Sequence, residues 1–241
     1  MSFFEKIRVG ERGAAAVPVR SPVAAGPAGE GNRRPSNGLK DFMWLLSDVK
    51  QGQVLDLGQV SQATVAFFTE RGFKIYSEDM LRGWKEFLEE EERRLRASSA
   101  APAPVSEAGA AQPDAQYSRA ALAKRFLETS LTYQPGTFHA VLLWDVLDYL
   151  DDELLPMVVA RLFWMLRAGG VVLGLFHNKK PETFHRYRVP DAETIELIPA
   201  NGLLPALRQM QNRDLMNLFA AYRSSKTFVG RDQLREALFL K

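Results

Sequence analysis

The residues from Gln53 to Thr64 constrain the fold of this chain more than any other stretch. The mostly apolar run from Gln53 to Leu57 predicts a short buried strand that Gly58 ends, and Ser61 has the side chain of a helix N-cap. A strand, a glycine turn and a helix in this order predict an α/β fold, in which backbone N–H groups and a helix N-terminus converge on a ligand. Taken alone, the stretch is interpreted equally well as an ordinary turn between a strand and a helix.

Composition narrows the classes of function. The 241 residues are 46% hydrophobic and 25% charged, which predicts a globular chain with one well-buried domain. A net charge of +2 is too small to indicate a nucleic acid or an anionic membrane as partner. The chain has no cysteine for a disulfide or a thiolate site, and its three histidines lack metal-ligand spacing, so no metal is predicted. No run approaches about 18 apolar residues, and we expect a soluble, cytoplasmic protein.

Two stretches are predicted to lie outside the packed domain. Residues 1–35 contain Gly, Pro, Ala and Arg with few large apolar groups, which predicts a flexible N-terminal tail. Residues 97–116 lack aromatic residues, leucine and isoleucine, and predict a disordered insertion. Residues 36–241, apart from this insertion, are expected to form the domain.

Hydrophobic periodicity predicts alternating strands and helices along this domain. A helix that closes at Gly169-Gly170 and a hairpin that turns at Pro190-Asp191 are among these elements. The predicted helices are 36–49, 61–70, 80–96, 118–127, 152–167 and 213–222, and the predicted strands are 53–57, 73–76, 138–144, 171–176, 184–189, 194–198, 224–229 and 236–240.

The order of these features resembles the class I S-adenosylmethionine-dependent methyltransferases. The features are the strand that ends in Leu55-Asp56-Leu57-Gly58, an acidic pair about 20 residues later, the strand–helix–strand series from Phe138 to Phe176, and the two terminal strands. The resemblance implies a Rossmann-like α/β fold, with a mostly parallel sheet and a C-terminal antiparallel hairpin. It also implies S-adenosylmethionine as cofactor and a methyl acceptor that the sequence does not identify.

The resemblance further implies a set of cofactor-binding residues at the strand ends. A carboxylate that follows the second strand suits the two ribose hydroxyls, because it offers a pair of hydrogen-bond acceptors. For the tryptophan and aspartate that follow the fourth strand, a packed indole and a helix N-cap are equally good interpretations. The implied residues are Asp56, Gly58, Gln59, Ser61, Glu78, Asp79, Trp144 and Asp145.

The loop departs from the family pattern, which has glycines at positions 58, 60 and 62. Val60 and Gln62 stand at two of these positions, and a β-branched valine resists positive φ. A dinucleotide-binding loop fits less well, because Ala63 replaces its last glycine. Two hypotheses follow: a methyltransferase with a degenerate glycine loop, and a non-catalytic, methyltransferase-like protein that acts through protein contacts.

Catalytic residues are not identified by the sequence, because methyl transfer depends mainly on aligning the two reactants. His177 and Asn178 follow the fifth strand at the ligand-facing edge and are the best candidates to face a substrate. The run from His185 to Arg188 is basic and aromatic. It predicts an edge strand protected by charge, with binding of an anionic partner as the alternative.

Overall fold

The computed structural model of the chain describes residues 33–100, 115–230 and 234–241. Most of the predicted tail and most of the predicted insertion therefore lie outside the described residues. Where the structure describes the ends of these two segments, it differs from the prediction. Residues 33–35 form a strand, and the helix predicted to end at Arg96 continues to Ala100.

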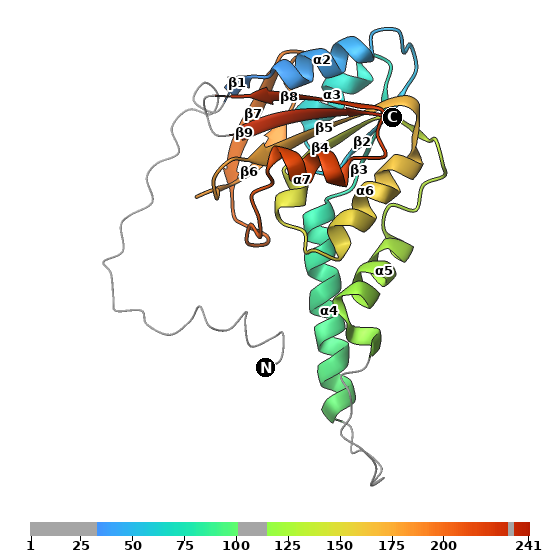
Figure 1. Cartoon of the computed structure of the whole chain (residues 1–241), viewed down its shortest axis with the longest axis vertical. Helices are drawn as coiled ribbons and strands as arrows, with labels where there is room; N and C mark the ends of the chain where they lie inside the picture. The colour runs from blue at the N-terminus through green and yellow to red at the C-terminus, as the bar shows by residue number, and fades with distance from the viewer. Residues whose placement is uncertain (1–32, 101–114, 231–233) are drawn as a thin grey trace, which may run out of the picture. The chain divides into compact units, whose positions relative to one another are not determined.

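A six-stranded sheet forms the centre of the fold (Figure 1). Its strand order is β3-β2-β4-β5-β9-β8; the first four strands are parallel, and β9 is antiparallel to both of its neighbours. The predicted fold class, a mostly parallel Rossmann-like sheet with a C-terminal antiparallel hairpin, is confirmed. The strands are β2 (Gln53–Asp56), β3 (Lys74–Ser77), β4 (Phe138–Trp144), β5 (Leu166–His177), β8 (Ser224–Val229) and β9 (Leu234–Leu240).

Helices cover both faces of this sheet, because the central strands are apolar on both sides. In β4, Val141 and Leu143 point into one hydrophobic cluster, and Ala140 and Leu142 point into the other. The first cluster packs against α4 (Met80–Ala100), α5 (Arg119–Thr129), α6 (Leu154–Met165) and α7 (Asn212–Leu218). The second packs against α2 (Asn37–Leu45) and α3 (Gln62–Thr69). The described residues also form short 3₁₀ turns, η1 (Ala115–Tyr117) and η2 (Val146–Asp148).

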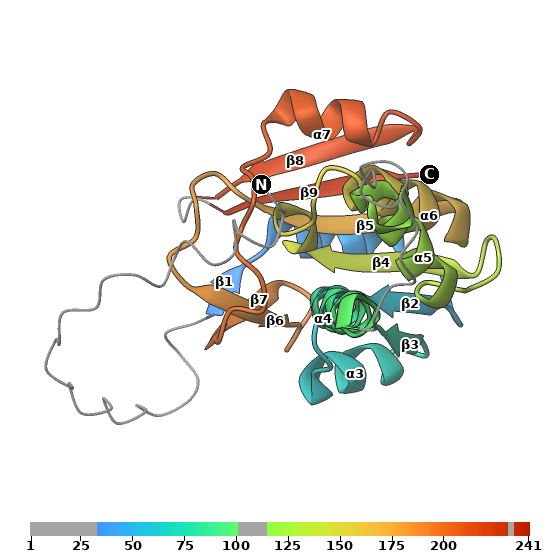
Figure 2. The same ribbon diagram turned by 90° about the horizontal axis from the view of Figure 1, so that it is seen from below.

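The predicted hairpin forms, but it belongs to a second, three-stranded sheet (Figure 2). Its strands β6 (Phe184–Arg188) and β7 (Thr194–Ala200) are antiparallel, and β1 (Arg33–Pro35) adds to the far side of β7. An ion pair holds β1 in place, since Arg34 Nη2 lies 2.8 Å from the carboxylate of Glu236 in β9. This long-range pair explains why residues 33–35 are ordered although their sequence resembles a tail.

The connection from α6 to β5 differs from its prediction. Gly169 and Gly170 were expected to close the helix, but α6 ends at Met165 and both glycines lie inside β5. Gly169 has φ +77°, and its N–H donates to the carbonyl oxygen of Lys241 at 2.9 Å. Pairing with Lys241 therefore extends β5 to residues before 171, where local sequence predicts the strand to begin.

Candidate functional site

The candidate site lies at the carboxyl ends of β2, β3 and β4. The chain runs from β2 to β3 on one side and later places β4 on the other side of β2. In an open α/β sheet, ligands bind where the strand order reverses in this way. Most of the residues that the sequence implicated lie together at this topological switch point. Several of them, however, make contacts that stabilise the fold.

Asp56 ends β2 and is almost fully buried. Its Oδ1 accepts hydrogen bonds from the backbone N–H of Gly58 at 2.9 Å and from Nε1–H of Trp144 at 2.6 Å. Burial raises the pKa of Asp56 to about 6, and the two donors only partly oppose this shift. Asp56 therefore holds the turn and the indole together.

Gly58 is required here for close approach of the indole. A Cβ at this position would lie 2.7 Å from Cδ1 of Trp144, closer than such atoms approach in proteins. The positions after it leave the crevice: Val60 is exposed, and Ser61 is the N-cap of α3. Gln62, which stands at a position where the family pattern has a glycine, is the exposed first residue of α3.

The two carboxylates that follow β3 are both hydrogen-bonded to other residues of the chain. Glu78 Oε2 accepts from the N–H of Leu131 at 3.2 Å. Burial and the nearby Glu78 raise the pKa of Tyr133. Asp79 immediately precedes α4, and its two oxygens accept from the backbone N–H and the Nε–H of Arg82, each at 3.2 Å. Asp79 lines the crevice, whereas Glu78 contacts the segment between α5 and β4.

Trp144 fills the crevice at the end of β4. It is 2% exposed, and its φ of 54° is unusual for a bulky residue. Its indole stacks on the ring of Tyr187 from β6, with ring centroids 5.4 Å apart and planes 9° apart. Tyr187 in turn donates its hydroxyl hydrogen to Oδ2 of Asp145 at 2.9 Å. The two rings therefore form a plug, hereafter the Trp144–Tyr187 plug, between the large sheet and β6.

Asp145 belongs to a second buried carboxylate cluster. Burial raises its pKa to about 7, although the nearby His177 and the hydrogen bond from Tyr187 lower it. Its neighbour Asp148 is fully buried, and Oδ2 of Asp148 lies 2.8 Å from the backbone nitrogen of His177 and 3.0 Å from Nδ1 of that residue. Burial of the imidazole opposes protonation, but contacts with both aspartates raise the pKa of His177 above its ordinary value.

This cluster modifies the sequence-based view of substrate-facing residues. His177 is largely buried and bonded to Asp148, whereas Asn178 is exposed. Asp148 was missed by sequence analysis because it lies in the 3₁₀ turn η2, where no periodicity singles it out. Among the described residues, no group of three or more metal-ligating side chains is found, and no helix is long and apolar enough to cross a membrane.

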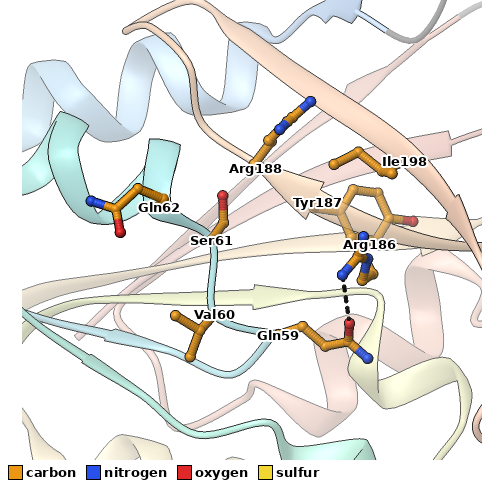
Figure 3. Close-up of a pocket in the computed structure, with 8 residues that line it drawn as sticks. All are labelled: Gln59, Val60, Ser61, Gln62, Arg186, Tyr187, Arg188 and Ile198. Carbon is orange, nitrogen blue, oxygen red and sulfur yellow. Dashed lines mark hydrogen bonds between the residues drawn. The ribbon is translucent and has the colours of Figure 1, made fainter. Parts of the chain in front are cut away.

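Two cavities adjoin the plug. The crevice beside Gly58 retains about 20 Å³, and its walls include Asp79, Trp144 and Asp145. A neighbouring pocket of about 180 Å³ lies between the α3 turn and β6 (Figure 3). Small-molecule and cofactor sites generally measure about 300–1,000 Å³. In this conformation, the crevice does not accommodate a cofactor as large as S-adenosylmethionine.

Comparisons with known proteins found similarity to solved structures only. No protein-family model and no curated protein sequence matches the chain. A 1,6-didemethyltoxoflavin-N1-methyltransferase from Burkholderia thailandensis, solved with S-adenosylhomocysteine, is 14% identical; the match covers 85% of this chain and 78% of that one, with a TM-score of 0.41. A SAM-dependent methyltransferase from Aquifex aeolicus is 8% identical, with 85% and 89% covered and a TM-score of 0.41. At these values, the fold assignment rests on the strand order described above.

Proposed function

We propose that this chain is an S-adenosylmethionine-dependent methyltransferase whose cofactor crevice is closed in the described conformation. The supporting observation is the set of carboxylates that collects around Gly58 at the topological switch point. Asp56, Asp79 and Asp145 come from three separate strand ends and meet beside one glycine turn. Asp79 and Asp145 line the crevice, and a cofactor with ribose hydroxyls and a positively charged sulfonium suits carboxylates in that position.

Opening of the Trp144–Tyr187 plug is part of this proposal, because the plug occupies the volume that a cofactor needs. Bound S-adenosylmethionine would supply an activated methyl group. The chain's own contribution would be to open the crevice, exclude water and align an acceptor. Tyr187 is the natural point of opening, since it is carried by the separate three-stranded sheet. Because only the open state binds the cofactor, the apparent affinity is the affinity of the open state multiplied by the open fraction.

Calorimetric titration of S-adenosylhomocysteine into the full chain tests the proposal. We expect micromolar binding by the wild type. Tyr187→Phe removes the hydroxyl bond to Asp145 but keeps the ring. It should raise the open fraction and tighten binding at least fivefold, because loss of this bond should cost the closed state at least about 1 kcal/mol. As a control, the Val60→Gly/Gln62→Gly double variant should bind within about twofold of wild type, because neither side chain lines the crevice.

A second candidate function is that of a non-catalytic, methyltransferase-like protein that acts through protein contacts. The stacked plug favours it, because the crevice is filled by the chain itself and its polar groups are already bonded. This candidate predicts that wild type, Tyr187→Phe and the double glycine variant all stay silent with millimolar S-adenosylhomocysteine. That result would contradict the methyltransferase proposal. Turnover of any methyl acceptor would exclude the second candidate.

A further inference from the structure

The pocket next to the plug shares Gln59, Arg186 and Tyr187 with the crevice, and its other lining residues differ. One side is the turn from Gln59 to Gln62 that leads into α3, and the other is β6 from Arg186 to Arg188 with Ile198 of β7 (Figure 3). Its volume of about 180 Å³ is roughly nine times that of the crevice beside it. Two of its lining side chains, Arg186 and Arg188, are cationic, and none of its lining residues carries a carboxylate.

Strand geometry explains why the arginines face the pocket together. Successive side chains of a strand point to opposite faces, so Arg186 and Arg188 share one face and Tyr187 takes the other. Tyr187 is buried against Trp144, whereas Arg186 is exposed. Tyr187 therefore closes the crevice, and Arg186 and Arg188 line the pocket. Tyr187 also borders the pocket, and Arg186 also borders the crevice.

The charges around the pocket are unbalanced. Arg188 donates from Nε to the buried carboxylate of Glu196, which also lies 3.6 Å from Nε of Arg33. One carboxylate thus serves two guanidinium groups. Arg186 donates to a neutral group, Oε1 of Gln59, at 3.3 Å, as the dashed line in Figure 3 shows. A loosely held guanidinium at a concave surface is therefore available to a ligand.

We propose that this pocket binds a phosphate or carboxylate group of a small acidic molecule, at a site that adjoins the cofactor crevice and shares Gln59, Arg186 and Tyr187 with it. A guanidinium presents a fork of N–H donors that matches the oxygens of either group, and the charge strengthens each bond. The first turn of α3 adds backbone N–H groups that lack partners within the helix. The ligand displaces the weak Arg186–Gln59 contact and is held between Arg186 and Arg188. This inference does not depend on methyltransferase activity.

Titration of inorganic phosphate into the full chain at physiological ionic strength tests this site, because screening suppresses non-specific charge effects there. We expect saturable binding of one phosphate per chain. Arg186→Gln should weaken it at least tenfold, as for the loss of a charged hydrogen bond. Val60→Glu should do the same by placing a carboxylate in the pocket wall at an exposed position. The control Arg93→Gln removes an equally charged, exposed arginine from α4 and should leave binding unchanged.

Three outcomes would overturn the inference. They are unsaturable binding by the wild type, equal affinity in all four proteins, and displacement of bound phosphate by S-adenosylhomocysteine. The last would assign the pocket to the cofactor site. Phosphate binding by a chain that ignores S-adenosylhomocysteine would instead support the pocket and contradict the methyltransferase proposal, so the two failures are distinguishable.

Discussion

The two faces of β6 show two ways in which one strand borders a cavity. Its inner face carries Tyr187, which is buried, stacked and hydrogen-bonded, and the crevice behind it is nearly filled. Its outer face carries Arg186 and Arg188, and the pocket that they line, which Tyr187 also borders, remains open. The inner face stabilises the fold, so a ligand there must replace existing contacts. On the outer face, Arg186 is bonded to a neutral amide, so a ligand there adds contacts.

The largest effect is expected from removing the indole of Trp144, which packs against Tyr187 on the inner face of β6. Trp144→Ala should lower the free energy of unfolding by about 3–5 kcal/mol, because it empties a packed site and leaves Asp56 without its side-chain donor. Urea denaturation measures the change. Trp164→Ala is the matched control, since that indole is 45% exposed, and it should cost much less. Equal losses in the two variants would show that the plug does not stabilise the fold.

The pH dependence of stability separates the buried carboxylate from exposed ones. The pKa of Asp56 is about 6 in the folded chain against an ordinary 3.8. The folded state therefore holds this proton up to a higher pH than the unfolded state does. Its contribution to stability is therefore largest at low pH and is lost as the pH rises from about 4 to about 6, by roughly 3 kcal/mol in all.

Asp56→Asn keeps an acceptor for both donors and removes the titration. Wild type and variant unfolded in urea at several pH values should differ in slope between pH 4 and 6, since their other titrating groups are shared. Parallel curves would contradict the burial of a titrating Asp56.

A smaller effect is expected from the hydroxyl that joins the plug to Asp145. Tyr187→Phe should cost about 1–3 kcal/mol, because a buried carboxylate loses a donor. Tyr222→Phe is the control: its buried hydroxyl has no hydrogen-bond partner among the described residues, so the loss should be near zero or a slight gain. Thermal and urea unfolding compare the two, and a larger cost at Tyr222 would reverse the assignment.

The smallest effect on stability is expected for Arg186 on the outer face. Arg186→Gln should change the free energy of unfolding by less than about 0.5 kcal/mol, because the side chain is exposed and makes one long bond to a neutral amide. Urea denaturation of the variant and of wild type checks this. A loss above about 1 kcal/mol would mean that Arg186 holds the hairpin to the α3 turn and is not free for a ligand.

Local patterns predicted most of the fold. The β–α–β unit from Gln53 to Ser77 and the series from Phe138 to Phe176 follow from hydrophobic periodicity and glycine turns, which depend on neighbours in the chain. Predictions failed where distant residues intervene. Examples are β1, which depends on the Arg34–Glu236 ion pair, and the start of β5, where Gly169 pairs with the C-terminal residue.

The candidate site divides in the same way. The sequence by itself determined that Asp56, Gly58, Asp79 and Asp145 follow strand ends, because the carboxyl ends of parallel strands meet at one edge. Only the tertiary structure decided that this edge is closed. Trp144 becomes a plug only when β6 folds back from a second sheet and places Tyr187 against it, and such a contact depends on how separate elements pack in three dimensions.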